Sequence, residues 1–181
     1  GLSIASIAGE LVTAATNTAM YTYEIAPIAT LIESTILKRM AELADFGTSQ
    51  GTLTTGGSNG NLLGLLCARQ AKFPLSSHSG FDGTKMVAFV SEETHYSFSI
   101  ASNVIGIGHS NLITVRCNDD GQMLPEALDE EIQRALANDK IPFVVLATSG
   151  TTVRGSFDPL REISEVAHKY NLWMHVDAAW G

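Results

Sequence analysis

The stretch 171-NLWMHVDAAWG-181 decides how the rest of the chain is interpreted. Residues 172–176 form a short, mostly apolar run typical of a buried strand. Asp177 follows at the end of this run, just before the small residues Ala178 and Ala179. The carboxyl end of a strand in an open α/β sheet faces the ligand crevice, so an acid there needs a cationic or hydrogen-bonding partner. The alternative is that Asp177 caps a turn or a helix.

Composition and charge predict a globular α/β protein without a nucleic-acid or membrane partner. The chain has 181 residues, 45% of them hydrophobic and 17% charged, which is enough to bury one sizeable core. A formal net charge of −8 argues against binding to nucleic acid or to anionic membranes.

The two cysteines predict a reducing compartment. Cys67 and Cys117 lie far apart without the spacing of metal ligands, so we expect two buried thiols, no disulfide and no metal site. The apolar start lacks the basic residues of a signal peptide and is interrupted by polar residues, which makes the cytoplasm the expected location.

Strand and helix patterns alternate along the chain and predict a mainly parallel sheet with right-handed crossovers. The apolar runs predict strands at residues 86–90, 111–116, 143–147 and 172–177. Helical spacing predicts a first helix at residues 2–12, followed by a polar break at residues 13–18. It predicts further helices at residues 24–46, 62–70, 95–107, 125–138 and 160–170. We also expect residues 72–84 to form a loop, Leu136 to face the core, and Asp158 to cap the last helix.

The segment 51-GTLTTGGSNGN-61 is rich in glycine and precedes a predicted helix. Backbone N–H groups in such a segment can approach an anion, which a helix N-terminus also favours. The segment lacks the lysine of a nucleotide P-loop and the spacing of a dinucleotide fingerprint. It is therefore either a phosphate cradle for another ligand or a tight loop.

Two more polar groups follow predicted strands. His95 comes after the first strand at a helix start, where it either caps the helix or places a flat aromatic ring at the crevice. The segment 148-TSGTTVRG-155 supplies small hydroxyl side chains after the strand at residues 143–147, at the same edge of the sheet.

The order of these motifs resembles the large domain of the pyridoxal-phosphate-dependent group II amino-acid decarboxylases, a fold-type-I family. The resemblance is closest to the glutamate and cysteine-sulfinate decarboxylase branch. It is carried by NTAMYTYEIAP (17–27), TTGGSNGN (54–61), EETHYS (92–97), ATSGTTVRGSFDP (147–159) and YNLWMHVDAAWG (170–181).

This resemblance implies a three-layer α/β domain, a homodimer, the cofactor pyridoxal 5'-phosphate, and decarboxylation of a small acidic L-amino acid to an amine and CO2. It implies that residues 1–181 are the central part of the cofactor-binding domain, with further segments on both sides. Two alternatives stay open: a catalytically silent truncated homologue that acts as a binding or dimerisation module, and another fold-type-I enzyme such as an aminotransferase or a lyase.

The resemblance also implies roles for particular residues. Gly57 and Ser58 are expected to donate hydrogen bonds to the cofactor phosphate, and His95 to stack on the pyridine ring. Thr152 is expected to form a hydrogen bond near the 3-oxygen of the ring or the substrate carboxylate.

Asp177 is expected to pair with the pyridine nitrogen and keep it protonated, so that the ring can absorb the electrons left by decarboxylation. Ala179 is expected to pack against the ring, and His175 only to pack.

The sequence departs from the family pattern at two points. Gly60 stands where relatives often carry Ser, Ala or Glu. The Schiff-base lysine of the family follows a His downstream of the H-V-D-A-A motif, and none of the lysines in this chain matches it. We therefore expect that lysine beyond Gly181.

Overall fold

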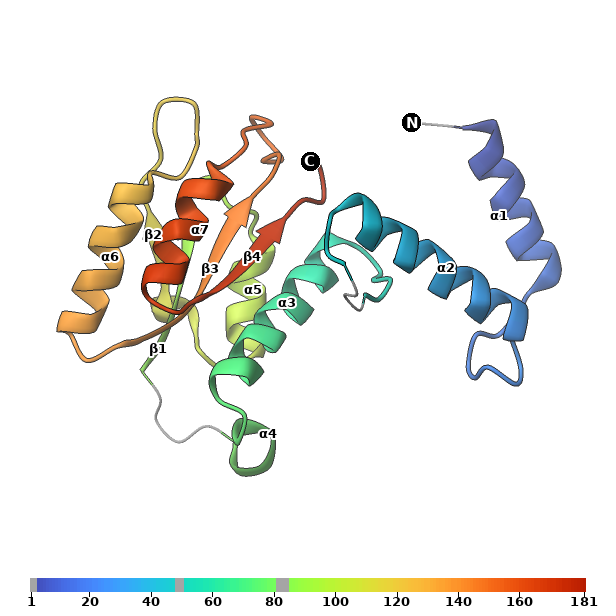
Figure 1. Ribbon diagram of the computed structural model, residues 1–181, viewed down its shortest axis with the longest axis horizontal. Coiled ribbons are helices and arrows are strands. Elements are labelled where there is room, and N and C mark those ends of the chain that lie inside the picture. Colours follow the sequence, from blue (N-terminus) through green and yellow to red (C-terminus); the bar gives the residue numbers. More distant parts are fainter. Residues whose placement is uncertain (1–2, 48–50, 81–84) are drawn as a thin grey trace. The chain divides into compact units, whose positions relative to one another are not determined.

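The computed structural model describes residues 3–47, 51–80 and 85–181 (Figure 1). The chain consists of two compact units, residues 1–53 and residues 54–181. The first unit contains α1 (Ile4–Thr16) and α2 (Pro27–Leu43), and neither helix has a buried residue. Pro27 occupies the first turn of α2, where its missing N–H is not needed. The helix ends before the expected Phe46 because Asp45 adopts a left-handed conformation, with φ of 56°.

The second unit is built on a four-stranded sheet in which every pairing is parallel. The strands are β1 (Met86–Ser91), β2 (Leu112–Val115), β3 (Ile141–Thr148) and β4 (Trp173–Asp177), in the spatial order β2-β1-β3-β4. The four strands predicted from apolar runs are therefore present, and the α/β class is confirmed. Thr148 and Asp177 are paired at the carboxyl ends of β3 and β4.

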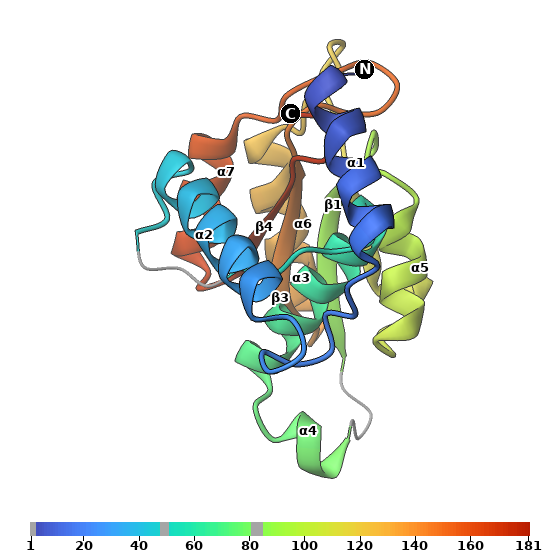
Figure 2. The same ribbon diagram turned by 90° about the vertical axis from the view of Figure 1, so that its right-hand side faces the viewer.

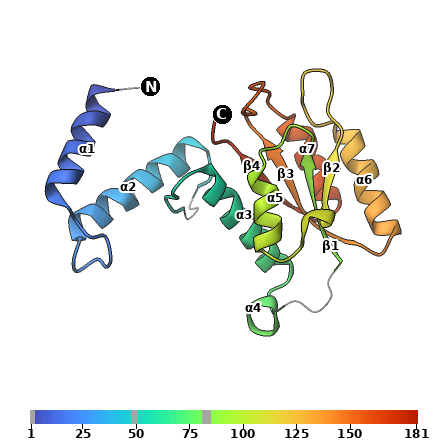
Figure 3. The ribbon, with the colours of Figure 1, turned by 180° about the vertical axis from the view of Figure 1, so that it is seen from behind.

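Alternate residues of the central strands supply two separate hydrophobic clusters, as the period of a strand requires. On one face, α3 (Gly57–Lys72) and α5 (Ser97–Val104) pack on the sheet, with Leu65 and Phe98 fully buried. The opposite face is covered by α6 (Pro125–Ala137) and α7 (Leu160–Lys169). Figure 2 shows the strands between α5 and α7, and Figure 3 shows the same layers from behind.

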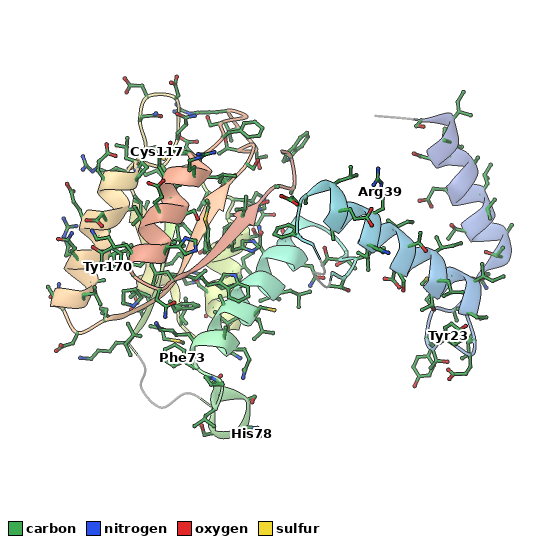
Figure 4. All side chains as sticks on the ribbon, in the orientation of Figure 1. Tyr23, Arg39, Phe73, His78, Cys117 and Tyr170 are labelled. Atoms are coloured by element: carbon green, nitrogen blue, oxygen red, sulfur yellow. The ribbon has the colours of Figure 1, made fainter. Side chains whose placement is uncertain are left out.

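Aromatic side chains extend both clusters at helix ends. Phe73 directly follows α3 and packs on the first cluster, whereas Tyr170 directly follows α7 and packs on the second (Figure 4). Both side chains are partly buried. The sheet between its two helix layers forms a three-layer α/β arrangement.

Several local predictions were wrong. Helix α3 begins at Gly57 and not at residue 62, and α5 is shorter than the predicted helix at residues 95–107. A short helix, α4 (Ser76–Ser79), lies in the expected loop at residues 72–84, of which residues 81–84 are outside the described part of the chain. Leu136 is 48% exposed, whereas Ala127, which was not predicted to face the core, is a buried residue of α6. Cys67 is exposed and Cys117 half-buried, although both are free thiols as expected.

Asp158 does not cap α7, because Pro159 holds the cap position. The Asp158 carboxylate is 4% exposed and accepts hydrogen bonds from the backbone N–H groups of Met123 and Thr148, each at 2.7 Å. Burial raises the pKa of Asp158, and the two N–H groups oppose that shift. The carboxylate thus ties the segment before α6 to the end of β3.

Candidate functional site

A cavity of about 200 Å³ lies at the carboxyl edge of the sheet in the second unit. It borders the ends of β3 and β4 and the start of α3, close to the point where the strand order reverses between β1 and β3. All the predicted site residues line this cavity: Gly57, Ser58, His95, Thr152, Asp177 and Ala179. The tertiary structure therefore brings the separate sequence motifs to one place.

The start of α3 supplies backbone donors to the cavity. Gly57 and Ser58 occupy the first positions of the helix, where N–H groups have no acceptor within the helix. A Cβ atom on Gly57 would lie 2.9 Å from the Cβ atom of Ala179, so only glycine permits this approach between α3 and the segment after β4. Of the two alternatives for the Gly-rich segment, a helix N-terminus facing a cavity favours the anion cradle.

Asp177 places a buried carboxylate at the cavity. Its residue is 8% exposed, and its two oxygens accept hydrogen bonds from Asn61 Nδ2 at 2.7 Å and from the Ala179 backbone N–H at 3.1 Å. Within the described ranges, no Lys or Arg forms an ion pair with it. The bond to Ala179 is the local turn that the alternative prediction envisaged. The carboxylate nevertheless keeps acceptor capacity for a cationic N–H group in the cavity.

His95 lies between β1 and α5 rather than inside the helix. Its Nδ1 atom is 2.8 Å from Ser97 Oγ and accepts the backbone N–H of Ser97 at 3.2 Å. The imidazole thus binds the first turn of α5 and also lines the cavity. The two predictions for His95, a local helix contact and a ring at the crevice, are compatible.

The loop after β3 forms a third wall. Gly150 has φ of 85°, and a Cβ atom on it would lie 3.0 Å from the backbone nitrogen of Gly181, so a glycine is required. Thr151 is buried and its hydroxyl accepts the Ser156 N–H at 3.0 Å, whereas Thr152 is exposed at the cavity. Thr148 is also buried at the cavity, and its hydroxyl has no hydrogen-bond partner among the described residues.

His175 does more than pack. Its Nε2 atom lies 2.9 Å from Asn61 Oδ1, and its ring meets Phe98 edge-on at 5.7 Å. Burial lowers the pKa of His175, and the charge of Asp177 partly opposes this shift. A Cβ atom on Gly64 would lie 2.3 Å from His175 Nδ1, so this glycine makes room for the imidazole.

Sequence reasoning missed Asn61 and Ser97, and it placed Thr148 in the hydroxyl-rich segment at this edge without giving it a role of its own. Asn61 escaped because the Gly-rich segment was read as a loop up to residue 61. A helix starting at Gly57 would have placed Ser58 and Asn61 one turn apart on the same face. The alternation of a strand would likewise have placed His175 and Asp177 on a common face.

Charged and metal-binding groups near the cavity are few. Glu93 lines the cavity and forms an ion pair with Arg154 at 3.3 Å. Across residues 3–47, 51–80 and 85–181, no three His, Cys, Asp or Glu side chains group as metal ligands. The helices in these ranges are all too short or too polar to cross a membrane.

Comparison with known proteins shows similarity over the whole chain. The model of the pyridoxal-dependent decarboxylase conserved domain matches residues 1–181. The acidic amino acid decarboxylase GADL1 of Xenopus tropicalis is 42% identical over 182 residues, covering 100% of this chain and 36% of the relative.

Solved structures agree in fold. The crystal structure of mouse CSAD has a TM-score of 0.97 at 39% identity, covering 100% of this chain and 39% of that one. The crystal structure of Oryza sativa TDC with PLP and tryptamine has a TM-score of 0.86 at 29% identity, covering 96% and 38%. The chain spans about a third of the length of the curated relatives it matches.

Proposed function

Because this chain belongs to the pyridoxal-dependent decarboxylase family, we propose that it forms part of the active site of an enzyme that decarboxylates an L-amino acid with an acidic side chain. The products are the corresponding amine and CO2. The similarity to an acidic amino acid decarboxylase supports this substrate class.

The observation that carries the proposal is the Asp177 carboxylate at the cavity. It has amide donors but no cation among the described residues, which suits a pyridinium N–H. The opposite requirement, an anion site for a phosphate, is met by the start of α3 at Gly57 and Ser58. The residues present therefore fit pyridoxal 5'-phosphate.

When bound, pyridoxal phosphate supplies an electron sink for the electron pair left by the departing CO2. In this proposal Asp177 holds the proton on the pyridine nitrogen, and Gly57 and Ser58 bind the phosphate through their N–H groups. His95 offers a flat ring for stacking, and Thr152 offers a hydroxyl donor at the exposed side of the cavity.

Ala179 contributes by being small. Its Cβ atom lies against Gly57 at the start of α3, which has no Cβ atom of its own. The two segments can therefore approach each other closely. In the proposed site Ala179 packs against the cofactor ring and, with Trp180, forms the wall that follows β4.

We further propose that the protein acts as a homodimer. Support comes from the first unit, where neither helix has a buried residue. Apolar side chains of α2 form a hollow lined by Ile28, Leu31, Ile32, Thr35 and Ile36. Such a face requires a covering surface, and a second subunit is the proposed one.

The test uses the purified full-length protein loaded with pyridoxal phosphate. Aspartate, cysteine sulfinate and glutamate are supplied separately, and released CO2 and amine are quantified. Stoichiometric CO2 and amine from at least one acidic substrate are expected. Formation of keto acids would favour an aminotransferase instead, and cofactor binding without turnover of any amino acid would favour the silent binding module.

A further inference from the structure

Asn61 links Asp177 and His95, the two side chains proposed to contact the cofactor ring, through hydrogen bonds to Asp177 and to Ser97. It is 3% exposed, lies in the second turn of α3, and contacts side chains of β4 and α5. We propose that Asn61 is a positioning residue that holds Asp177 and His95 in one hydrogen-bonded unit and sets the tautomers of His95 and His175. The inference rests on the proposed cofactor site and adds a residue to it.

The orientation of the Asn61 amide follows from its neighbours. Nδ2 lies 2.7 Å from Asp177 Oδ2 and 3.0 Å from Ser97 Oγ, while Oδ1 lies 2.9 Å from His175 Nε2. An ionised carboxylate only accepts, so the reverse orientation would place two acceptors 2.7 Å apart in a buried site. Both Nδ2 hydrogens are therefore used, one toward Asp177 and one toward Ser97.

The direction of each further bond is then determined. Oδ1 of Asn61 can only accept, so His175 carries a proton on Nε2. Ser97 Oγ accepts from Asn61, which leaves its own hydrogen for His95 Nδ1 at 2.8 Å. His95 Nδ1 also accepts the Ser97 N–H, so the ring proton of His95 lies on Nε2.

This arrangement suits the proposed chemistry. With its Nδ1 lone pair engaged by two donors, His95 stacks as a ring without a proton on Nδ1, and like-charge repulsion with a pyridinium ring is avoided. The Asp177 carboxylate is held in one orientation by Asn61 and the Ala179 N–H. One amide thus couples the stacking ring to the acid that pairs with the cofactor nitrogen.

The helix and the strand are matched for this contact. Asn61 and Gly64 are three residues apart on α3, and His175 and Asp177 are two residues apart on β4, so each pair lies on one face. Asn61 binds both strand residues, and Gly64 leaves space for the His175 ring. His175 in turn holds the amide of Asn61 in the orientation that Asp177 requires.

The first test compares the affinity of the full-length apoprotein for pyridoxal phosphate among variants. Asn61→Asp keeps the shape of the side chain but removes both N–H donors. We expect the dissociation constant for pyridoxal phosphate to rise at least about tenfold. Ser97→Ala is expected to weaken binding by a smaller factor. The matched control is Ser102→Ala on α5, the helix of Ser97. It removes a buried hydroxyl that, among the described residues, bonds only the Ser99 carbonyl, and no change in affinity is expected.

The cofactor affinity of the double variant Asn61→Asp with Ser97→Ala shows whether the two residues act through one hydrogen-bonded unit or independently. If they act together, the double variant loses less affinity than the product of the two single losses. Multiplicative losses, or an affinity of Asn61→Asp equal to that of the unmodified protein, would overturn the inference.

The second test does not depend on whether a variant folds, because it measures the histidine tautomers in the unmodified apoprotein. Nitrogen-15 NMR of histidine-labelled protein, assigned with His95→Phe and His175→Gln, is expected to show both rings protonated on Nε2. A proton on Nδ1 of His95 would reject the inference. Failure of the unmodified protein to bind pyridoxal phosphate would instead reject the proposed function, while the tautomer signals would still decide the hydrogen-bond arrangement.

Discussion

At the scale of single residues, Asp177 is buried and His175 half-buried at the site, and both have neutral hydrogen-bond partners among the described residues. Asp177 is bonded to an amide and a backbone N–H, and His175 to the amide of Asn61. Partners of this kind orient a side chain without neutralising its charge. The charge of Asp177 is therefore left for a ligand. Substitutions at Asp177, His95 and His175 test the roles of these three residues.

Asp177→Asn is expected to reduce turnover of the full-length enzyme by at least roughly two to three orders of magnitude, about 3–4 kcal/mol of lost transition-state stabilisation. The substituted amide oxygen can still accept from one of the two donors, Asn61 Nδ2 or the Ala179 N–H, while its NH2 group faces the other. Some loss of stability therefore accompanies the loss of the charge opposite the pyridine nitrogen. Turnover and cofactor content are measured together. A variant that binds cofactor and keeps near wild-type turnover would contradict the role of Asp177.

The stacking role of His95 is tested by a pair of substitutions. His95→Phe keeps a flat ring and is expected to retain much of the cofactor affinity, whereas His95→Ala is expected to lose it. Titration of each apoprotein with pyridoxal phosphate gives the two dissociation constants. Equal affinities for both variants would leave His95 with its contact to the first turn of α5 and no more.

His175 predicts a pH dependence of stability. Burial holds its pKa below the ordinary value of 6.5, so below that pH the unfolded chain binds a proton that the folded chain does not. The free energy of unfolding therefore falls as pH decreases through and below that value. His175→Gln keeps a donor for Asn61 Oδ1 but does not titrate. Its melting temperature is expected to drop less than that of the wild type between about pH 7.5 and about pH 5.5, and equal drops would refute this contribution.

At the scale of elements, two of the segments that differ from the local predictions shape the cavity edge. Helix α3 starts at Gly57, which turns a Gly-rich stretch into a helix N-terminus. The segment before α7 is held by Asp158, whose carboxylate bonds backbone groups at Met123 and at Thr148, the last residue of β3. The position of the loop after β3 thus depends on one buried acid.

Asp158→Asn is expected to lower the free energy of unfolding by about 2–3 kcal/mol, because the new NH2 group would face one of two buried N–H donors. Denaturant unfolding of the full-length protein measures the change. Asp120→Asn, at an exposed position of the neighbouring turn, is the matched control and is expected to change little. Equal stabilities of the two variants would show that the Asp158 bonds contribute nothing net.

At the scale of the whole molecule, the two units differ in how they bury apolar side chains. The second unit has a hydrophobic cluster on each face of its sheet, whereas the helices of the first have no buried residue. Isolated helices of this length gain little stability from their own hydrogen bonds. The first unit therefore depends on surfaces that cover its apolar residues, and the proposed dimer supplies them.

Ile32→Asp is expected to weaken the dimer of the full-length protein, because it places a charge in the apolar hollow of α2. Sedimentation over a range of concentrations measures the monomer–dimer equilibrium. Ser34→Asp adds the same charge to an exposed position of the same helix outside the hollow, and it is expected to leave the dimer intact. A dimer of unchanged strength in Ile32→Asp would place the interface elsewhere.

The sequence alone determined the parallel α/β class and the gathering of the predicted site residues at one edge. Its apolar runs located the strands, and parallel strands all point their carboxyl ends the same way, so His95, Thr152 and Asp177 had to lie near one another. This inference needs only periodicity and chain direction, which are local properties of the sequence.

Only the tertiary structure decided which polar groups meet. Asn61 and Asp177 are 116 residues apart and Asn61 and His175 are 114 apart, and no local pattern specifies either bond. The same holds for Asp158, which accepts from the N–H groups of Met123 in a loop and Thr148 at a strand end instead of capping the next helix. It also holds for Cys67, which is exposed on α3. Periodicity identifies the face of an element, but the partner of a buried polar group depends on how closely two elements approach. That approach is determined by small residues such as Gly57 and Gly64 once the whole sheet is assembled.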